Sequence, residues 1–228
     1  IDPMAAVSLS AQVALATVIF GAPVALLFGW LLARGRFPGK WLLSSLLMVP
    51  MVLPPVVTGF LLLDLLGPGA FLGSLLSGMG IRVAFAPLGA VVAAAAVSMP
   101  LYVLAVRGAF EAIDARYEGV SHSLGVGPLA TFRRVTLPLA LPGFAAGAVL
   151  TFARALGEFG ATVVLAGNIE GETRTIALAI YTLLESPNGM DAARLLTWLS
   201  VGLSLAALIG YEWFTRWQRG RLEVDGGR

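Results

Sequence analysis

Four polar side chains recur at intervals of three and four residues in an otherwise apolar stretch of the chain. They are Thr151, Arg154, Glu158 and Thr162. On one continuous α-helix this spacing places all four side chains on the same face. Charged groups inside hydrocarbon usually face a bundle interior or a water-filled cavity, so the face predicts a solute path. The alternative is that Arg154 and Glu158 form an ion pair that only holds the helix in place.

A second group of polar residues fills the segment 107–137, which contains Glu118 and ends shortly before Pro138. Residues 111–124 can form a helix, the two glycines and the proline of 125–128 interrupt it, and residues 129–135 can resume it. We expect a helix-turn-helix in this segment. The alternative is that the charges of this segment only solvate a connecting loop.

The composition excludes most enzyme chemistry. The chain has no Cys and His122 is its only His, which argues against disulfides, zinc sites, Cys nucleophiles and Ser-His-Asp triads. The sequence contains no Gly-x-x-x-x-Gly-Lys-Ser/Thr motif, so nucleotide phosphates would have to be bound by another subunit. The net charge of +2 is not gathered into basic patches with aromatic residues, and nucleic acid is therefore not an expected partner.

Hydropathy predicts an all-α membrane protein. Hydrophobic residues make up 58% of the chain and charged residues 12%, with a mean hydropathy of +0.88. Five charge-free windows are long enough to cross a bilayer, namely 8–33, 41–63, 83–106, 135–153 and 195–211, and the fourth extends to about 167 if Arg154 and Glu158 lie within the membrane. Residues 71–80 are too short to cross, so they predict a surface or re-entrant helix. We expect a polytopic bundle of about five transmembrane helices.

The basic residues predict the orientation of the bundle. Eleven Lys and Arg residues fall on one side of the predicted spans and three on the other: Arg34, Arg36, Lys40, Arg107, Arg116, Arg133, Arg134, Arg216, Arg219, Arg221 and Arg228 against Arg82, Arg174 and Arg194. Because cytoplasmic loops retain positive charge, residues 1–7 should be periplasmic and the tail 216–228 cytoplasmic. Residues 8–33 are too long for a signal-peptide core and are followed by a basic loop, so we expect a retained helix; residues 1–3 resemble a cloning remnant before a natural start at Met4.

Several motifs resemble those of membrane subunits of binding-protein-dependent ABC importers. Such subunits carry a cytoplasmic E-A-A motif with a Gly further on and a terminal I-x-L-P; here Gly125 and Pro138 match, Glu118 stands one residue early and Val120-Ser121 replace the paired alanines. Four further blocks are similar in order and spacing to molybdate ABC importer permeases: RFPGK (36–40), LPPVVTG (53–59), ARALGEFGAT (153–162) and GETRTI (171–176). Sulfate and tungstate permeases share much of this pattern. The resemblance covers residues of about 8–215.

This resemblance implies a type I ABC importer-like fold whose permease domain spans residues 8–215, with a coupling helix in the loop at about 111–137. It implies a homodimer, two copies of an ATPase subunit that binds ATP and Mg, and a periplasmic molybdate-binding protein that carries specificity. The chain itself would bind no cofactor and no metal. It would be a multi-pass protein of the bacterial inner membrane, embedded in the lipid bilayer.

The resemblance and the polar residues together define two sets of candidate site residues. The ATPase-coupling set is Glu118, Ser123, Leu124, Gly125, Val126, Gly127 and Pro138, in which Leu124 and Val126 supply apolar contact and Glu118 meets a donor group of the ATPase. The candidate translocation set is Pro54, Pro55, Thr58, Ser98, Thr151, Arg154, Glu158 and Thr162. A weakly polar lining suffices, because tight binding at mid-membrane would slow release of the solute.

Two other classes of function remain as alternatives. A gradient-driven secondary transporter should show inverted repeats and mid-membrane acidic residues, whereas five spans divide badly into halves and Glu158 has Arg154 beside it. An intramembrane enzyme needs a nucleophile with a base or a metal cluster, and His122 lies in the predicted cytoplasmic loop. Gly143 and Gly147 form a Gly-x-x-x-Gly step for close helix contact, either within one subunit or between two.

Overall fold

All elements of the described chain are helices. The computed structural model describes residues 2–225, and among them the side chains of all but 214, 215 and 217–225. The elements are α1 (Pro3–Arg34), α2 (Lys40–Val52), α3 (Pro55–Leu66), α4 (Phe71–Gly78), α5 (Pro87–Glu111), α6 (Ala115–Ser123), α7 (Pro128–Thr131), the π-helix η1 (Phe132–Thr136), α8 (Leu137–Leu156), α9 (Gly160–Leu165), α10 (Ile176–Leu184) and α11 (Met190–Asp225). Most of the predicted cytoplasmic tail, 216–228, therefore lies outside the described side chains.

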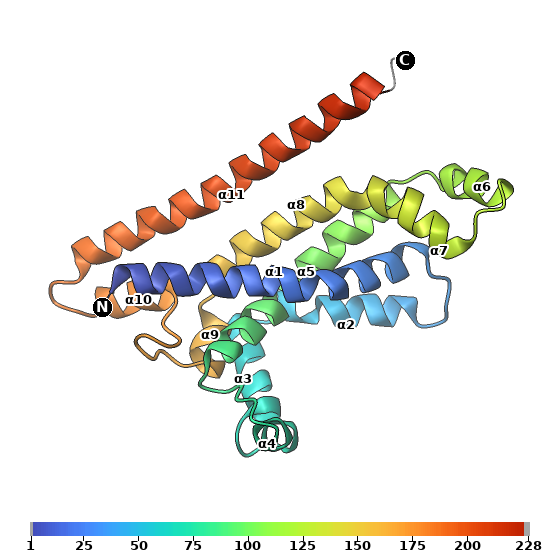
Figure 1. Cartoon of the computed structure of the whole chain (residues 1–228). Helices are drawn as coiled ribbons and strands as arrows, with labels where there is room; N and C mark the ends of the chain where they lie inside the picture. Colours follow the sequence, from blue (N-terminus) through green and yellow to red (C-terminus); the bar gives the residue numbers. More distant parts are fainter. Residues whose placement is uncertain (1, 226–228) are drawn as a thin grey trace.

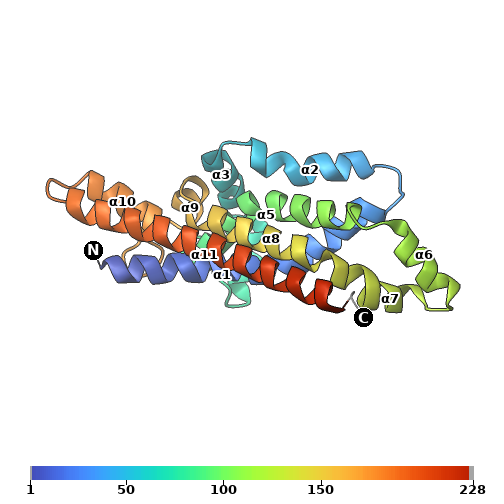
Figure 2. The same cartoon turned by 90° about the horizontal axis from the view of Figure 1, so that it is seen from above.

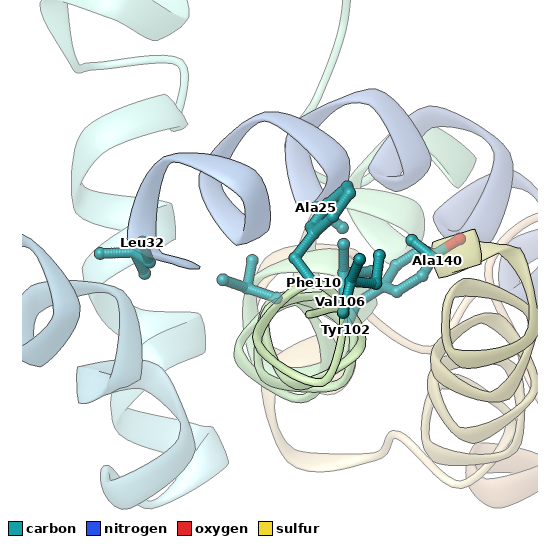
Figure 3. Packing of buried hydrophobic residues seen from close by; sticks show 8 residues of the cluster. Ala25, Leu32, Tyr102, Val106, Phe110 and Ala140 are labelled. Carbon is teal, nitrogen blue, oxygen red and sulfur yellow. The ribbon is translucent and has the colours of Figure 1, made fainter. Parts of the chain in front are cut away.

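The helices α1, α5 and α8 form the centre of the bundle. Tyr102 and Phe110 of α5 are fully buried between α1 and α8, beside Ala25 and Ala140 (Figure 3). Burial of such aromatic side chains against small residues on neighbouring helices is typical of close helix packing in membranes. This central packing fixes the three helices relative to one another.

The Gly-x-x-x-Gly step of α8 packs within the subunit. A Cβ atom at Gly147 would lie 2.9 Å from the Cβ atom of Ala105, and one at Gly143 would come closer still to the Cβ atom of Ala109. Both alanines belong to α5. The small residues thus let α8 approach α5, so this face of α8 is used inside the chain rather than against a second copy.

Four helices within residues 2–225 are long and apolar enough to cross a membrane. They are Pro3–Arg34, Pro87–Glu111, Pro128–Leu156 and Met190–Trp213. A fifth span exists only if α2 and α3 count as one, and these two helices are bent by 111° at the break between them. The prediction of about five spans is confirmed in this form, with a bent helix pair in the window 41–63.

Pro54 and Pro55 explain the bend. Leu53 has extended backbone, φ −66° and ψ 144°, and Pro54 likewise, φ −54° and ψ 133°. A residue before proline is pushed out of the helical region, and the proline nitrogen cannot donate the helical hydrogen bond. Two consecutive prolines therefore end α2, and Pro55 begins α3 at a position that tolerates a missing donor.

The fourth predicted window is also broken. Helix α8 ends at Leu156, residues 157–159 are not helical, and α9 covers only Gly160–Leu165. The expectation that Thr151, Arg154, Glu158 and Thr162 share one continuous helical face is therefore wrong. Two of these residues lie on α8, one in the break and one on α9.

The bundle has two distinct ends. The start of α1 and α10 lie at one end, whereas α6, α7 and the last turns of α11 lie at the other (Figures 1 and 2). Helix α4, at residues 71–78, confirms a short helix in the predicted segment 71–80 and follows α3 on the side of the bundle (Figure 1). Its place at the surface or within the membrane stays a prediction.

Candidate translocation pathway and coupling site

The two helix breaks lie against each other. A Cβ atom at Gly160 would lie 3.0 Å from the Cβ atom of Pro55, and one at Gly59 would lie 2.8 Å from the Cα atom of Ala161. The α2–α3 break and the α8–α9 break are therefore joined by direct contact between α3 and α9. Interrupted spans free backbone groups from the helical ladder, and in transporters such interruptions mark solute sites near the middle of the membrane.

An ion pair spans the second break. Arg154 Nη1 lies 2.9 Å from Glu158 Oε2, and the other oxygen of this carboxylate accepts a 2.9 Å hydrogen bond from the backbone N–H of Ala161. The side chain of Glu158 is 2% exposed and that of Arg154 is 36% exposed. The carboxylate is thus satisfied inside the protein, while part of the Arg154 side chain is exposed.

The other predicted pathway residues differ in exposure. Thr58, Ser98, Thr151 and Thr162 are buried, and the hydroxyl of Ser98 donates a 2.6 Å hydrogen bond to the carbonyl of Ala94. The hydroxyls of Thr58 and Thr151 have no hydrogen-bond partner among the described residues. Pro54 is exposed and Pro55 half-buried. In the single chain, Pro54, Pro55 and Arg154 are the members of the set that reach the surface.

One acidic residue near this region was missed by the sequence analysis. Asp64 is exposed on α3 among leucines, and no ion pair joins it to any of the described side chains. The hydropathy window ended at residue 63 because of this charge. The sequence did contain a signal for this residue, namely an acidic side chain inside an apolar run. Placing a charge in hydrocarbon costs free energy, so such a residue is a candidate for a functional role. No group of three or more His, Cys, Asp or Glu side chains in the described part of the chain could hold a metal ion.

The predicted helix-turn-helix is present with different bounds. Helix α5 continues to Glu111, and α6 begins only at Ala115, after a turn in which the Asp114 side chain accepts a 2.9 Å hydrogen bond from the N–H of Arg116. The expectation of one helix over 111–124 is therefore wrong, because Asp114 caps a new helix. After the turn, residues 129–135 are helical as predicted, with a π-helical segment from Phe132 to Thr136.

Helix α6 presents an apolar surface to the outside. Its Tyr117 and Val120 are 58% and 61% exposed, and Leu124, directly after the helix, is 77% exposed. These three residues line an open pocket of about 650 Å³ together with Asp114, Arg116, Ser121 and Val135. Apolar side chains exposed on a helix outside the bundle centre are a feature of protein interaction sites.

The turn after α6 is held in one conformation. Gly125 has φ +77°, and its N–H donates a 2.9 Å hydrogen bond to the carbonyl of His122. The hydroxyls of Ser121 and Thr131 form a buried 2.8 Å hydrogen bond across the turn. The remaining predicted coupling residues surround it: Ser123 and Gly127 are exposed, Val126 is half-buried, and Pro138 is exposed in the first turn of α8.

Glu118 points to a donor within its own chain. Its Oε1 lies 3.3 Å from Arg34 Nη2 and accepts a 3.0 Å hydrogen bond from the hydroxyl of Thr136. Both donors, Arg34 and Thr136, belong to the same chain, and a contact between Glu118 and a donor group of the ATPase stays a prediction. Sequence reasoning missed both, because no spacing rule connects Glu118 with Arg34 on α1 or with Thr136 in η1.

The fold and the site together define the membrane component of an ABC importer: an all-helical bundle with a broken span and a short helix projecting at one end. Residues 25–223 match the family described as binding-protein-dependent transport system inner membrane component. The chain belongs to this family. It is the membrane permease of such a transporter and not its ATPase subunit, and membership implies an ATPase and a binding protein as partners. The gradient-driven transporter and the intramembrane enzyme are thereby excluded.

Curated relatives agree with this assignment. The chain is 48% identical over 217 residues to the molybdenum transport system permease protein ModB of Escherichia coli K12, covering 95% of each chain. It is 42% identical over 214 residues to ModB of Haemophilus influenzae, covering 93% of each. A sulfate transport system permease protein, CysT of Salmonella typhimurium, is 38% identical over 182 residues, which cover 80% of this chain and 66% of that one.

Solved structures share the fold. An alginate-importing bacterial ABC transporter matches with a TM-score of 0.75 at 16% identity, covering 95% of this chain and 80% of that chain. The MetNI methionine ABC transporter in an inward-facing conformation matches with a TM-score of 0.72 at 19% identity, covering 92% and 93%. The predicted fold class is confirmed, as is an inner-membrane, multi-pass location.

Proposed function

We propose that this chain passes molybdate across the inner membrane as the permease of an ABC importer. The observation that carries the proposal is the 48% identity over 95% of the chain to a molybdenum transport permease. The sulfate permease is less similar and is covered over a smaller part of its length, which favours molybdate over sulfate. Both anions are tetrahedral dianions, so the permease needs to discriminate little if a binding protein selects the solute.

The orientation follows from charge and shape. We place the amino terminus in the periplasm and α6 and α7 in the cytoplasm, because the end of the bundle that carries α6 is also the end where Arg34, Arg116, Arg133 and Arg134 lie. A periplasmic molybdate-binding protein then delivers solute at the end with α10. Two copies of an ATPase, which bind ATP and Mg, meet the end with α6.

Two copies of the chain would enclose the path. The paired helix breaks and the Arg154–Glu158 pair then face the space between the copies. Glu158 compensates the charge of Arg154, but Arg154 is partly exposed, so its remaining N–H groups can donate hydrogen bonds to a passing oxyanion without holding it tightly. Pro54 and Pro55 leave backbone groups near this point. The buried residues Thr58, Ser98, Thr151 and Thr162 support the walls in this arrangement.

The apolar face of α6 is the ATPase contact in this proposal. Tyr117, Val120 and Leu124 expose the large apolar area that a groove on the ATPase would cover, and the fixed turn at Gly125 presents it rigidly. Ser123, Val126 and Gly127 shape the turn, and Pro138 marks the point where the movement enters α8. Preorganised apolar anchors of this kind dominate protein interfaces.

Vesicle transport tests the proposed function. The permease, its ATPase and its binding protein are reconstituted, and uptake of molybdate, tungstate and sulfate is measured with ATP inside the vesicles. We expect ATP-dependent uptake of molybdate that requires the binding protein. Uptake of sulfate with no uptake of molybdate would overturn the substrate assignment. Failure of the ATPase to co-purify with the wild-type permease would overturn the proposed docking.

A further inference from the structure

Three segments far apart in the sequence meet at one carboxylate. Glu118 of α6 lies 3.3 Å from Arg34 Nη2, at the last residue of α1, and its Oε1 also accepts the 3.0 Å hydrogen bond from Thr136 in η1. Arg34 Nη2 donates a further 3.0 Å hydrogen bond to the carbonyl of Ile113, in the turn between α5 and α6. We name Arg34, Glu118 and Thr136 the clasp.

The side chains of the clasp are partly or fully buried, which strengthens the interactions between them. The side chains of Arg34 and Glu118 are 23% and 24% exposed, and Thr136 is 2% exposed. Exposed ion pairs contribute little because water screens them, whereas partly buried pairs with additional hydrogen bonds hold their geometry. The pair Arg116–Asp114 on the outer side of α6 is by contrast more than half exposed on both partners and 3.9 Å long. The Arg116–Asp114 pair only joins α6 to its own N-cap, whereas the clasp joins α6 to another helix.

The clasp ends at a helix that the covalent chain does not connect to α6. The chain leads from α6 back to α5 and forward through α7 and η1 to α8. Helix α1 is reached only across space, through Arg34. Since α1 packs along both α5 and α8, a displacement of α6 that reached Arg34 would act on all three central helices.

We propose that Arg34 and Glu118 are positioning residues that transmit the movement of α6 to α1 during transport. In this role Glu118 acts within the subunit, and the ATPase is contacted by the apolar face of α6 instead. The inference rests on the proposed function, because it takes α6 to be the part that the ATPase moves. It goes beyond that function by adding α1 to the moving unit and by giving Glu118 a partner in its own chain.

Charge reversal separates this role from ATPase docking. Arg34→Glu, Glu118→Arg and the double variant are each assembled with the ATPase and the binding protein. We expect both single variants to keep the ATPase in a pull-down but to lower binding-protein-stimulated ATP hydrolysis and uptake at least about fivefold, the lower range of typical coupling energies. The double variant should recover most of both activities, since it restores an opposite-charge pair. Glu111→Arg is the matched control, because it breaks the 2.7 Å Arg107–Glu111 pair at the same end within α5 alone, and it should stay close to wild type.

The opposite pattern overturns the inference. If Glu118→Arg loses the ATPase and the double variant does not recover it, Glu118 is an ATPase contact. If all three variants transport normally, the clasp transmits nothing. If instead the wild-type complex fails to assemble or to transport molybdate, the proposed function fails and not the clasp.

A covalent link provides a second measurement if a charge-reversed chain does not insert. The chain has no Cys, so Arg34→Cys with Glu118→Cys gives one reactive pair that a short bifunctional thiol reagent can join. We expect uptake to be low before cross-linking, because the double cysteine variant lacks the ion pair, and to recover after efficient cross-linking in the assembled complex, because the link joins the two residues again. Uptake close to wild type before cross-linking, or no recovery after complete cross-linking, would overturn the proposal.

Discussion

Arg154 and Glu158 lie on opposite sides of a helix end and still form a 2.9 Å ion pair. Arg154 belongs to the last turn of α8, whereas Glu158 stands in the break and its second oxygen caps the first turn of α9. In a continuous helix, an ion pair between residues four apart stabilises that helix. Here the same spacing joins two helices across an interruption. The pair therefore stabilises the break itself, and with it the contact between α9 and α3.

The first prediction concerns the asymmetry of this pair. Replacing Arg154 by Met strands a carboxylate that is 2% exposed, whereas replacing Glu158 by Gln leaves a guanidinium that can still reach the surface. We expect Arg154→Met to lower the free energy of unfolding by about 3 kcal/mol or more, the range for breaking a buried pair, and Glu158→Gln to lower it less. Thermal unfolding of the permease in detergent measures both.

The double variant Arg154→Met/Glu158→Gln separates structure from transport. It should be more stable than Arg154→Met alone, because no uncompensated charge remains. If Arg154 also attracts the solute, the double variant folds but takes up molybdate slowly. A double variant as unstable as Arg154→Met would contradict the account of the pair, and one with normal uptake would remove Arg154 from the pathway.

The second prediction concerns the contact between the two breaks. A Cβ atom at Gly59 would lie 2.8 Å from backbone atoms of Ala161, which cannot turn aside as a side chain would. We expect Gly59→Ala to destabilise the permease by about 1 to 3 kcal/mol, as overpacking does. Gly78→Ala is the control, because a Cβ atom there would meet nothing within 4 Å. Equal thermal midpoints for the two variants would argue against the close approach of α3 to α9.

The third prediction concerns the turn after α6. Gly125 has φ +77°, a conformation that costs other residues about 1 to 2 kcal/mol, so Gly125→Ala should loosen the turn and lower ATP hydrolysis stimulated by the loaded binding protein. Gly119→Ala is the matched control: Gly119 lies in α6 with open space around it, and alanine there should favour the helix. Stimulated ATPase activity in vesicles compares them, and equal activity would mean that the turn is only a connector.

The fourth prediction tests the orientation. Single cysteines at Ser74 and Asn188, both exposed, should react with impermeant thiol reagents from the periplasm, and one at Ser123 only from the cytoplasm. The Cys-free chain supplies its own unlabelled control. Labelling of Ser123→Cys in intact cells would reverse the topology proposed here.

Hydropathy and proline positions predicted the elements well, because both act locally along the chain. The long spans, the short helix at 71–78 and the turn at Gly125 all follow from residues close to one another in sequence. The end of α8 at Leu156 could not be predicted in this way. A glutamate such as Glu158 can cap a new helix or continue the face of an existing one, and the sequence does not distinguish the two. The periodic pattern through Thr162 predicted the wrong backbone at that point.

The contacts of Glu118 could not be predicted for a different reason. Arg34 was counted only as one of the basic residues that set the orientation, and nothing in the sequence distinguishes it from Arg36 or Lys40. Its role depends on the way α1 lies against α5 and α8, which is a property of the packed bundle. Long-range pairs of this kind are found only when the fold is known.

The π-helical segment from Phe132 to Thr136 determines how α6 and α7 are rotated around the axis of α8. A π-helical turn accommodates one residue more than an α-helical turn does. Deleting one residue there would restore an ordinary α-helix, but it would rotate everything before it by about 100° around the axis of α8. Thr136 and Glu118 would then face different directions. The extra residue thus sets the direction in which α6 projects from the bundle. A chain without it would still fold, but α6 would project in a different direction.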